Sequence, residues 1–125
     1  MYPIRYLLIA FLLITTFVCT AQTPDFSKVP GTVITHSPSA DRKYIGSPSL
    51  AILPNGHVAS HDFFGANSNE YESATSRIFL SKDKGKTWRQ ISEIDGQFWS
   101  KLFVHKGALY LFGTHCHHGN TIIRK

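Results

Sequence analysis

Cysteine is almost absent from this chain of 125 residues, which has only Cys19 and Cys116. Cys19 lies in a hydrophobic N-terminal segment that we expect to be removed, so Cys116 would be the only cysteine of the mature protein. A single cysteine excludes an intrachain disulfide, and the mature fold must then be stabilised by burial alone.

The chain also lacks a run of basic residues, although its formal net charge is +5 at neutral pH. Removal of Arg5 with the N-terminal segment lowers this charge to +4, and the lysines are spread from Lys28 to Lys125. No helical pattern gathers them on one face, so the sequence gives little support to nucleic-acid binding. A solvated, mildly basic surface is the simpler interpretation.

Long hydrophobic runs are missing except near the N-terminus. There, Arg5 precedes an almost unbroken apolar run from Tyr6 to Val18, and small residues follow up to Ala21. This order is typical of a signal peptide that comprises residues 1–21 and is cleaved before Gln22. The run is shorter than the ~20 apolar residues of a membrane span. We therefore expect a secreted or periplasmic protein that is not held in the membrane after cleavage.

Two alternatives remain open for this segment. An uncleaved membrane anchor is one, because the apolar run is not far below the length of a span. A lipoprotein signal at Cys19 is less favoured, because Phe17 and Val18 are bulky where a lipid-modification sequence needs small residues. In either case residues 22–30 form a Pro-containing linker, and residues 31–125 form the folded part.

The remaining chain shows short β-rich runs separated by turn signals, and no stretch has a sustained helical period. The predicted fold class is therefore all-β. The Pro54-Asn55-Gly56 turn predicts a hairpin, because Asn-Gly favours tight turns between antiparallel strands. The predicted strands are 31–36, 49–53, 57–61, 75–81 and 87–93, of which the last four form one antiparallel sheet.

The octet from Ser81 to Trp88 is the most specific motif of the chain. Asp83 is placed to cap backbone N–H groups of its own turn, and Gly85 tolerates a positive φ. Thr87 and Trp88 begin the return strand, and the indole needs burial. The octet resembles the Asp-box, or bacterial neuraminidase repeat, of sialidase-like β-propellers. The simpler alternative is a generic hairpin with an Asp-x-Gly turn.

The pattern then begins again. Strands are predicted at 100–105 and 108–112, joined by Lys106-Gly107, and residues 120–125 match the strand before the Asp-box. Gly107 follows Gly56 by 51 residues, near the repeat length of propeller blades. A propeller needs at least ~4 blades to close. We therefore expect the N-terminal one and a half blades of a longer protein, with 31–36 completing its last blade. A self-contained small β-sandwich is the alternative.

In an up-and-down sheet the Asp-box turn and the first hairpin turn lie at the same end. The loops 41–48, 61–74, 94–99 and 113–120 would share the opposite end, where propellers usually bind ligands. Trp99 and Tyr71 are candidate platforms for sugar rings in this region, although Trp99 is equally suited to filling the gap between blades.

The stretch Tyr44–Leu50, with Ala59–Gly65, is similar to the opening blade of sialidase-family proteins. In that family an arginine on this strand helps to hold the substrate carboxylate, but Gly46 stands in its place here. The resemblance implies a general acid in the loop 61–74, and Asp62 is the candidate, with Glu70 and Glu72 behind it. An aspartate that only caps its own loop is the structural alternative.

Further candidates for substrate binding are the residues at the same end: His61, Glu70, Tyr71, His115 and His117. His61 is equally suited to a structural hydrogen bond. The run from His115 to His118 includes Cys116 and suggests zinc, but consecutive residues of one loop cannot easily face one ion. We therefore predict no metal and no cofactor.

The resemblance implies a secreted, sialidase-like glycoside hydrolase that acts on a carbohydrate or glycoconjugate. The implied reaction is exo-α-sialidase-type or related glycan hydrolysis, and the substrate is either a sialoside or a glycan without the usual carboxylate, because Gly46 cannot make the arginine's contact. The alternative is a non-catalytic β-propeller that binds a glycan or a protein partner, because the fold alone does not determine the function.

Overall fold

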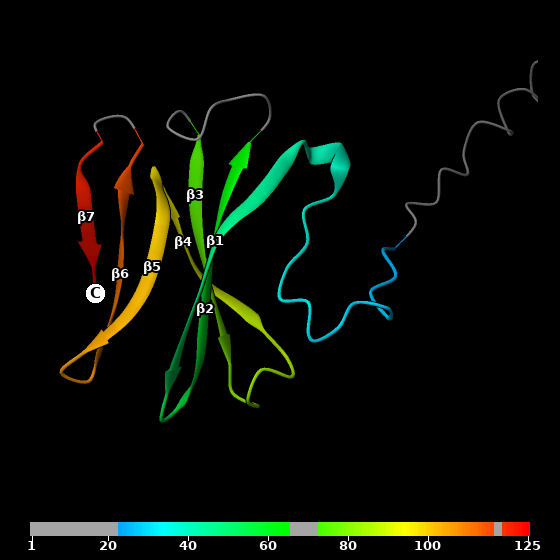
Figure 1. Cartoon of the computed structure of the whole chain (residues 1–125), viewed down its shortest axis with the longest axis horizontal. Helices are drawn as coiled ribbons and strands as arrows, with labels where there is room; N and C mark the ends of the chain where they lie inside the picture. The colour runs from blue at the N-terminus through cyan, green and yellow to red at the C-terminus, as the bar shows by residue number, and fades with distance from the viewer. Residues whose placement is uncertain (1–22, 66–72, 117–118) are drawn as a thin grey trace, which may run out of the picture.

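The computed structural model describes residues 23–65, 73–116 and 119–125, which form two antiparallel sheets after a short 3₁₀ turn, η1 (Ser39–Asp41). Sheet A has the order β1-β2-β3-β4 and sheet B the order β5-β6-β7 (Figure 1). The all-β prediction is confirmed. The strands are β1 (Lys43–Leu53), β2 (Gly56–Gly65), β3 (Ala74–Ser81), β4 (Arg89–Asp95), β5 (Gln97–His105), β6 (Ala108–His115) and β7 (Thr121–Arg124).

The predicted strand at 31–36 is wrong. No strand of the described residues pairs with this segment, and an isolated segment leaves its backbone N–H and C=O groups outside any ladder. Thr32 and Ile34 instead line a hollow on the face of sheet A that points away from sheet B. The predicted loop 94–99 is also wrong, because Gly96, with φ at 74°, alone separates β4 from β5.

The two sheets pack face to face, and the core lies between them. Ala51, Val58 and Ile78 of sheet A meet Leu102 and Leu111 of sheet B. Side chains alternate between the two faces of a strand, so each sheet has an inner face toward the other sheet and an outer face away from it. A second buried cluster, near the other end of the sheets, contains Phe64, Ala74, Phe98 and Cys116.

The strand pairing of sheet B repeats that of sheet A at a displacement of 52 residues. The bulge between Phe98 and Lys101 matches the bulge between Gly46 and Ser49. The displacement of 51 expected from the glycines is therefore wrong by one residue. This difference matters because a shift of one residue exchanges the two faces of a strand. The third strands, β3 and β7, are displaced by 45 residues. Ser76 pairs with Asp62 in sheet A, and Thr121 pairs with the equivalent Thr114 in sheet B.

This register relates the faces of the two sheets. The outer pair Phe103 and Tyr110 of sheet B takes the positions of the inner pair Ala51 and Val58 of sheet A. Conversely, inner Leu102 takes the position of outer Leu50. Each sheet therefore carries one face of the Ala51 type and one face of the Leu50 type. The two sheets pack head to tail, with the Ala51-type face of sheet A against the Leu50-type face of sheet B.

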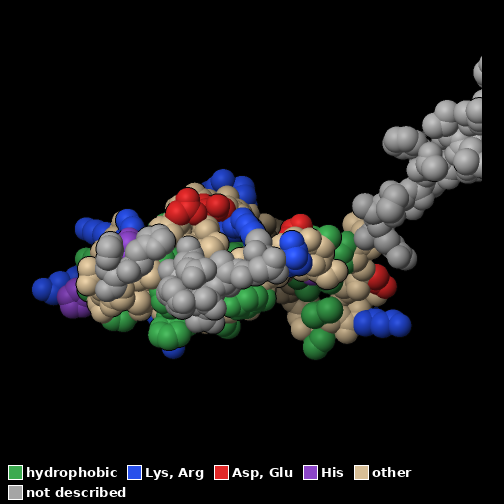
Figure 2. Space-filling view, turned by 90° about the horizontal axis from the view of Figure 1, so that it is seen from above, with side chains coloured by type: hydrophobic (Ala, Val, Ile, Leu, Met, Phe, Trp, Pro, Cys, Tyr) green, Lys and Arg blue, Asp and Glu red, His purple; other side chains and the backbone are tan. Residues whose placement is uncertain are grey.

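Both outer faces carry exposed apolar side chains. On sheet A, Leu50 is 56% exposed and Ile52 is 69% exposed. On sheet B, Phe103 is 40% exposed and Ile123 is 59% exposed. Seen from the end that bears the longer loops, charged side chains gather on one side of the molecule and hydrophobic side chains are visible on the opposite side (Figure 2). No helix within the described residues is long and apolar enough to cross a membrane.

Candidate functional site

The octet from Ser81 to Trp88, which resembles an Asp-box and is given that name below, forms a closed network of hydrogen bonds. The Asp83 carboxylate accepts hydrogen bonds from the Ser81 hydroxyl (2.8 Å), the Thr87 N–H (2.9 Å) and the Thr87 hydroxyl (2.6 Å). The Ser81 hydroxyl accepts the Gly85 N–H at 2.8 Å, and the Trp88 indole donates to the Gly85 carbonyl at 3.0 Å. The two bonds from Thr87, with that from Ser81, hold the pKa of Asp83 well below its usual range.

The connections sort into two ends of the molecule (Figure 1). The turn end carries the 54–55 and 106–107 turns and the Asp-box. The loop end carries the connections between β2 and β3 and between β6 and β7, and the turn at Gly96. Of the predicted substrate-binding residues, His115 lies at the loop end, whereas Glu70, Tyr71 and His117 lie outside the described residues.

His61 and Asp62 both lie within β2. His61 was predicted to end a strand, whereas the predicted loop position of Asp62 is wrong. The β2 strand continues to Gly65 because His61 pairs with Arg77 and Asp62 pairs with Ser76. As neighbours in one strand, the two side chains point to opposite faces of sheet A. Asp62 therefore faces sheet B, and His61 lies on the outer face.

Asp62 is fully buried between the sheets, with 0% of its surface exposed. Its Oδ1 accepts the Ser76 hydroxyl at 2.5 Å, and its Oδ2 accepts the Ser100 N–H at 2.7 Å. The Ser76 and Ser100 hydroxyl oxygens are 2.6 Å apart. Because the Ser76 proton goes to the carboxylate, Ser100 donates in this contact. We call Asp62, Ser76 and Ser100 the inter-sheet triad, because it joins β2 and β3 to β5.

Further residues enclose the inter-sheet triad. The Gln97 amide donates to the Ser100 hydroxyl at 3.4 Å and accepts from Arg124 Nε at 2.9 Å. A Cβ atom at Gly113 would lie 2.8 Å from both Gln97 Nε2 and Ser100 Oγ. Only glycine therefore leaves room for this network beneath β6.

The burial of Asp62 restricts its chemistry. A general acid must reach a substrate oxygen directly or through one water molecule. Both oxygens of Asp62 are engaged with groups of the protein, and no part of the side chain is exposed. The arrangement instead satisfies the polar groups of a buried interface, which favours a structural role.

His61 is half-buried, and its Nδ1 has no hydrogen-bond partner among the described residues. Burial lowers the pKa of His61, against a smaller opposing effect of Asp62. Its ring meets Phe79 edge-on at 5.9 Å. The imidazole lines the outer hollow of about 380 Å³, together with Leu50, Ala59 and Trp88. This hollow lies on a sheet face and not at the loop end.

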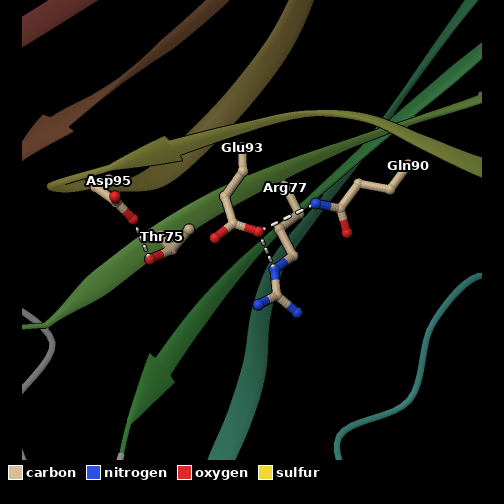
Figure 3. Close-up of polar contacts among 5 residues, drawn as sticks. All are labelled: Thr75, Arg77, Gln90, Glu93 and Asp95. Atoms are coloured by element: carbon tan, nitrogen blue, oxygen red, sulfur yellow. Dashed lines mark hydrogen bonds and ion pairs between the residues drawn. The ribbon is translucent and has the colours of Figure 1, made fainter.

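A row of polar contacts crosses the same outer face along β3 and β4 (Figure 3). Arg77 Nε donates to Glu93 Oε2 at 2.8 Å, and the Gln90 amide donates to the same oxygen at 3.0 Å. Nearer the loop end, Thr75 donates to Asp95 at 2.9 Å. The Arg77 guanidinium lies 4.2 Å from the ring centre of Phe63. Nothing in the sequence marks Arg77 or Glu93 as functional, because ordinary alternation along a strand predicts exposed charges there.

The loop end brings Trp99 and His115 onto neighbouring strands. Trp99 is 61% exposed and has φ at 51°, within the β5 bulge. The His115 N–H donates to the Asn120 carbonyl at 2.8 Å, and the His115 ring approaches Gly96. An indole can stack on a sugar ring and an imidazole can bind its hydroxyl groups, so both side chains are of kinds suited to a glycan.

Position 46 has no room for a side chain. A Cβ atom built there would lie 2.9 Å from the buried Phe64 ring, which also stacks on Tyr44 at 5.1 Å. An arginine at this position would require Phe64 to move. The absence of an arginine at position 46 is therefore built into the packing of β1 against β2.

Within the described parts of the chain, no three His, Cys, Asp or Glu side chains are grouped closely enough to hold a metal ion. Cys116 is buried, and His118 lies outside the described residues. In comparisons with known proteins, no family model matches the chain, and neither does any curated protein or solved structure.

Proposed function

We propose that the protein is a secreted glycoside hydrolase of the sialidase-like β-propeller class, in which sheets A and B are consecutive blades. The observation that carries this proposal is the complete Asp-box at the β3–β4 turn of a sheet with the order β1-β2-β3-β4. An up-and-down sheet of four strands is the unit from which propellers are built.

The repeated register supports the blade interpretation. Sheet B repeats the bulge and hairpin of sheet A at a displacement of 52 residues. The face of sheet A that bears Ala51 and the equivalent face of sheet B that bears Phe103 point in the same direction. A sandwich of two unrelated sheets would bury two inner faces and expose two polar ones. Here Leu50 and Phe103, on opposite outer faces, are both exposed, as expected for sheets that take further neighbours on both sides.

The proposed substrate is a carbohydrate or glycoconjugate that lacks the sialic-acid carboxylate, because Gly46 replaces the arginine and Phe64 fills its place. The proposed binding region is the loop end, where Trp99 would stack on a sugar ring and His115 would bind a hydroxyl group. Asp62 would not act as the general acid in this scheme. Its role is to hold the blades together, and the acid would come from another residue.

A non-catalytic glycan-binding propeller is a second candidate, and the burial of Asp62 favours it. Within the described residues Asp95 is a carboxylate at the loop end, and it already accepts a hydrogen bond from Thr75. Binding through Trp99 and His115 would not require a general acid.

The test uses the exported protein on chromogenic glycosides, some neutral and some bearing a carboxylate, together with an array of unmodified glycans. The proposal expects release of the chromogen from a neutral glycoside and no release from sialosides. Glycan binding without hydrolysis of any glycoside would establish the second candidate. Absence of both binding and hydrolysis would contradict both candidates.

Trp99→Ala provides the site-specific variant, with Trp99→Phe as the matched control. Removal of an aromatic side chain on which a nucleic-acid base stacks costs about 1–3 kcal/mol. By analogy, loss of sugar stacking should cost roughly 10-fold or more in affinity. We expect Trp99→Ala to weaken glycan binding by this amount and Trp99→Phe to retain most of it. Equal binding by both variants would remove Trp99 from the site.

A further inference from the structure

A second hollow lies at the turn end, between the two tight turns of sheet A. Its volume is about 300 Å³, and its lining includes Pro54, Asn55, His57, Lys82 and Lys84. We call it the turn-end hollow. Its walls are the 54–55 turn with the adjoining strand ends on one side and the Asp-box on the other, so the site is complete within sheet A.

Strand pairing brings the two turns together. His57 pairs with Ser81, so the 54–55 turn lies beside the start of the Asp-box. A Cβ atom at Gly56 would lie 2.8 Å from the Ser81 carbonyl oxygen, so only glycine permits this close approach. The His57 ring reaches the Asp-box, because its Nδ1 is 3.9 Å from where a Cβ atom at Gly85 would lie. The turn-end hollow is therefore held in place by the sheet itself.

The turns at this end are basic. Four lysines and one aspartate occur in the three turns, which gives them a formal charge of +3 (residues 54–55, 82–88 and 106–107). The charge is concentrated at the turn-end hollow, because Lys82 and Lys84 both line it. Both side chains are exposed, and neither forms an ion pair with another described residue.

The one acid of these turns, Asp83, does not line the turn-end hollow. Its carboxylate is engaged within the turn, where it accepts three hydrogen bonds from Ser81 and Thr87. The charged side chains that border the hollow are therefore of one sign, and such a cleft raises the local concentration of the opposite ion. Lysine suits an anionic ligand, because its ammonium is a flexible point charge with three hydrogen-bond donors.

The lining also indicates which polyanion fits. Proteins that bind single-stranded nucleic acid provide aromatic side chains on which bases stack, and none of the described residues that line the turn-end hollow is Phe, Tyr or Trp. A sulfate ester needs only cationic groups and hydrogen-bond donors. We propose that the turn-end hollow binds a sulfate group of an anionic polysaccharide. The choice of a polysaccharide rests on the proposed function, whereas the site lies at the opposite end from the proposed loop-end site.

The test measures binding of the exported protein to dextran sulfate, with unmodified dextran of the same length as the neutral reference. The ionic strength is about 0.15 M, so that attraction between distant surface charges is screened. The wild type should bind dextran sulfate and not dextran. Equal competition by free sulfate ions, at the same concentration of sulfate groups, would show that the ion alone is the ligand and would overturn the polysaccharide.

The site variant combines Lys82→Gln with Lys84→Asn. Asparagine suits position 84, because Lys84 has φ at 60° and asparagine adopts this left-handed conformation readily. Loss of two exposed charge contacts should weaken dextran sulfate binding roughly 10-fold. Urea unfolding checks that the turn is intact. If the double variant unfolds more easily, Lys82→Gln alone provides the test and should lose part of the affinity.

Two control pairs remove the same charge elsewhere. Lys28→Gln with Lys43→Gln changes two exposed lysines outside the three turns. Lys86→Gln with Lys106→Gln changes two exposed lysines that lie in these turns but do not line the turn-end hollow. Both control pairs should bind dextran sulfate within roughly 3-fold of the wild type, because they remove only the more distant attraction.

A wild type that does not bind dextran sulfate would overturn the proposal. An equal loss of affinity in the site variant and in either control pair would also overturn it, because binding would then follow net charge. Oligothymidylate bound as tightly as dextran sulfate would overturn it as well, because any polyanion would then serve. Hydrolysis of a neutral glycoside, measured on the same proteins, should be unchanged in the site variant, and its absence in the wild type would count against the proposed function alone.

Discussion

The Asp-box turn and the inter-sheet triad use the same chemistry in opposite environments. In each, one aspartate accepts hydrogen bonds from a serine or threonine hydroxyl and from a backbone N–H. Asp83 lies at the surface and closes a turn of its own hairpin. Asp62 lies with no exposed surface and joins two sheets, with its N–H donor 38 residues away.

The difference between these regions lies in what replaces a lost hydrogen bond. Water can satisfy the groups around Asp83, because the turn is open to solvent. No water reaches the groups around Asp62 without a rearrangement of the core, so they would remain unsatisfied. The same hydrogen bonds are therefore worth more to stability at Asp62, even though Asp83 belongs to the more recognisable motif.

The largest effect is expected for Asp62→Ala. The Ser100 N–H and the Ser76 hydroxyl would lose their acceptor inside the interface, which costs about 3 kcal/mol or more when buried donors are left unpaired. Urea unfolding should show a loss of this size or no cooperative transition. Asp95→Ala, which removes an exposed carboxylate that accepts a hydrogen bond from Thr75, is the control and should lie within about 0.5 kcal/mol of the wild type.

Gly113→Ala should destabilise the protein by about 1–3 kcal/mol, as overpacking of a tight core does. The new methyl group would press on Gln97 and Ser100, which are both buried. Urea unfolding measures this effect. An unfolding midpoint for Gly113→Ala equal to that of the wild type would show that the network below Gly113 has room to adjust.

Asp83→Asn is expected to destabilise the protein less than Asp62→Ala does. Because the pKa of Asp83 is lower in the folded state, its stabilising contribution is complete above the ordinary value near 3.8 and is lost as pH falls below it. The difference in unfolding midpoint between wild type and Asp83→Asn should therefore shrink in acid. A difference that stays constant from pH 6 down to about 2.5 would contradict the account of the turn.

The smallest effect is expected for His61→Gln. Burial lowers the pKa of His61, so below its ordinary value near 6.5 the unfolded chain binds the proton more readily than the folded one. Wild-type stability should fall slightly as pH decreases through this region, and the variant should show a weaker dependence. The check is a comparison of urea midpoints at pH 7.5 and 5.5, and identical slopes would mean that His61 does not titrate differently on folding.

Local patterns in the sequence predicted much of the fold. The strands from 49 onward and both hairpins follow from alternation and turn residues, and the Asp-box turn follows from five positions within eight residues. The strand at 31–36 failed because alternation cannot show whether a partner strand exists. The repeat displacement failed by one because glycines occupy different places in the two turns, whereas pairing fixes the register.

The inter-sheet triad could not be predicted in the same way. Ser76 and Ser100 are ordinary residues in their own strands, and only the packing of β5 on β2 brings them to Asp62. One signal was present, because an aspartate directly before Phe63 and Phe64 in a β-rich run must be either buried with partners or at a strand end. A strand that ends at residue 61 favours the second option, and the catalytic interpretation of Asp62 depends on it.

Hydrogen exchange at the Ser100 amide tests the central claim most directly, namely that Asp62 joins the two sheets. The Ser100 N–H has Asp62 as its acceptor at 2.7 Å, and the Thr87 N–H provides the internal reference because its acceptor is Asp83. The account predicts slow exchange at Ser100 in the wild type and much faster exchange in Asp62→Asn, with Thr87 unchanged. Equal protection of Ser100 in both proteins, together with a loss of glycoside turnover in Asp62→Asn, would contradict the account and restore Asp62 to the chemistry.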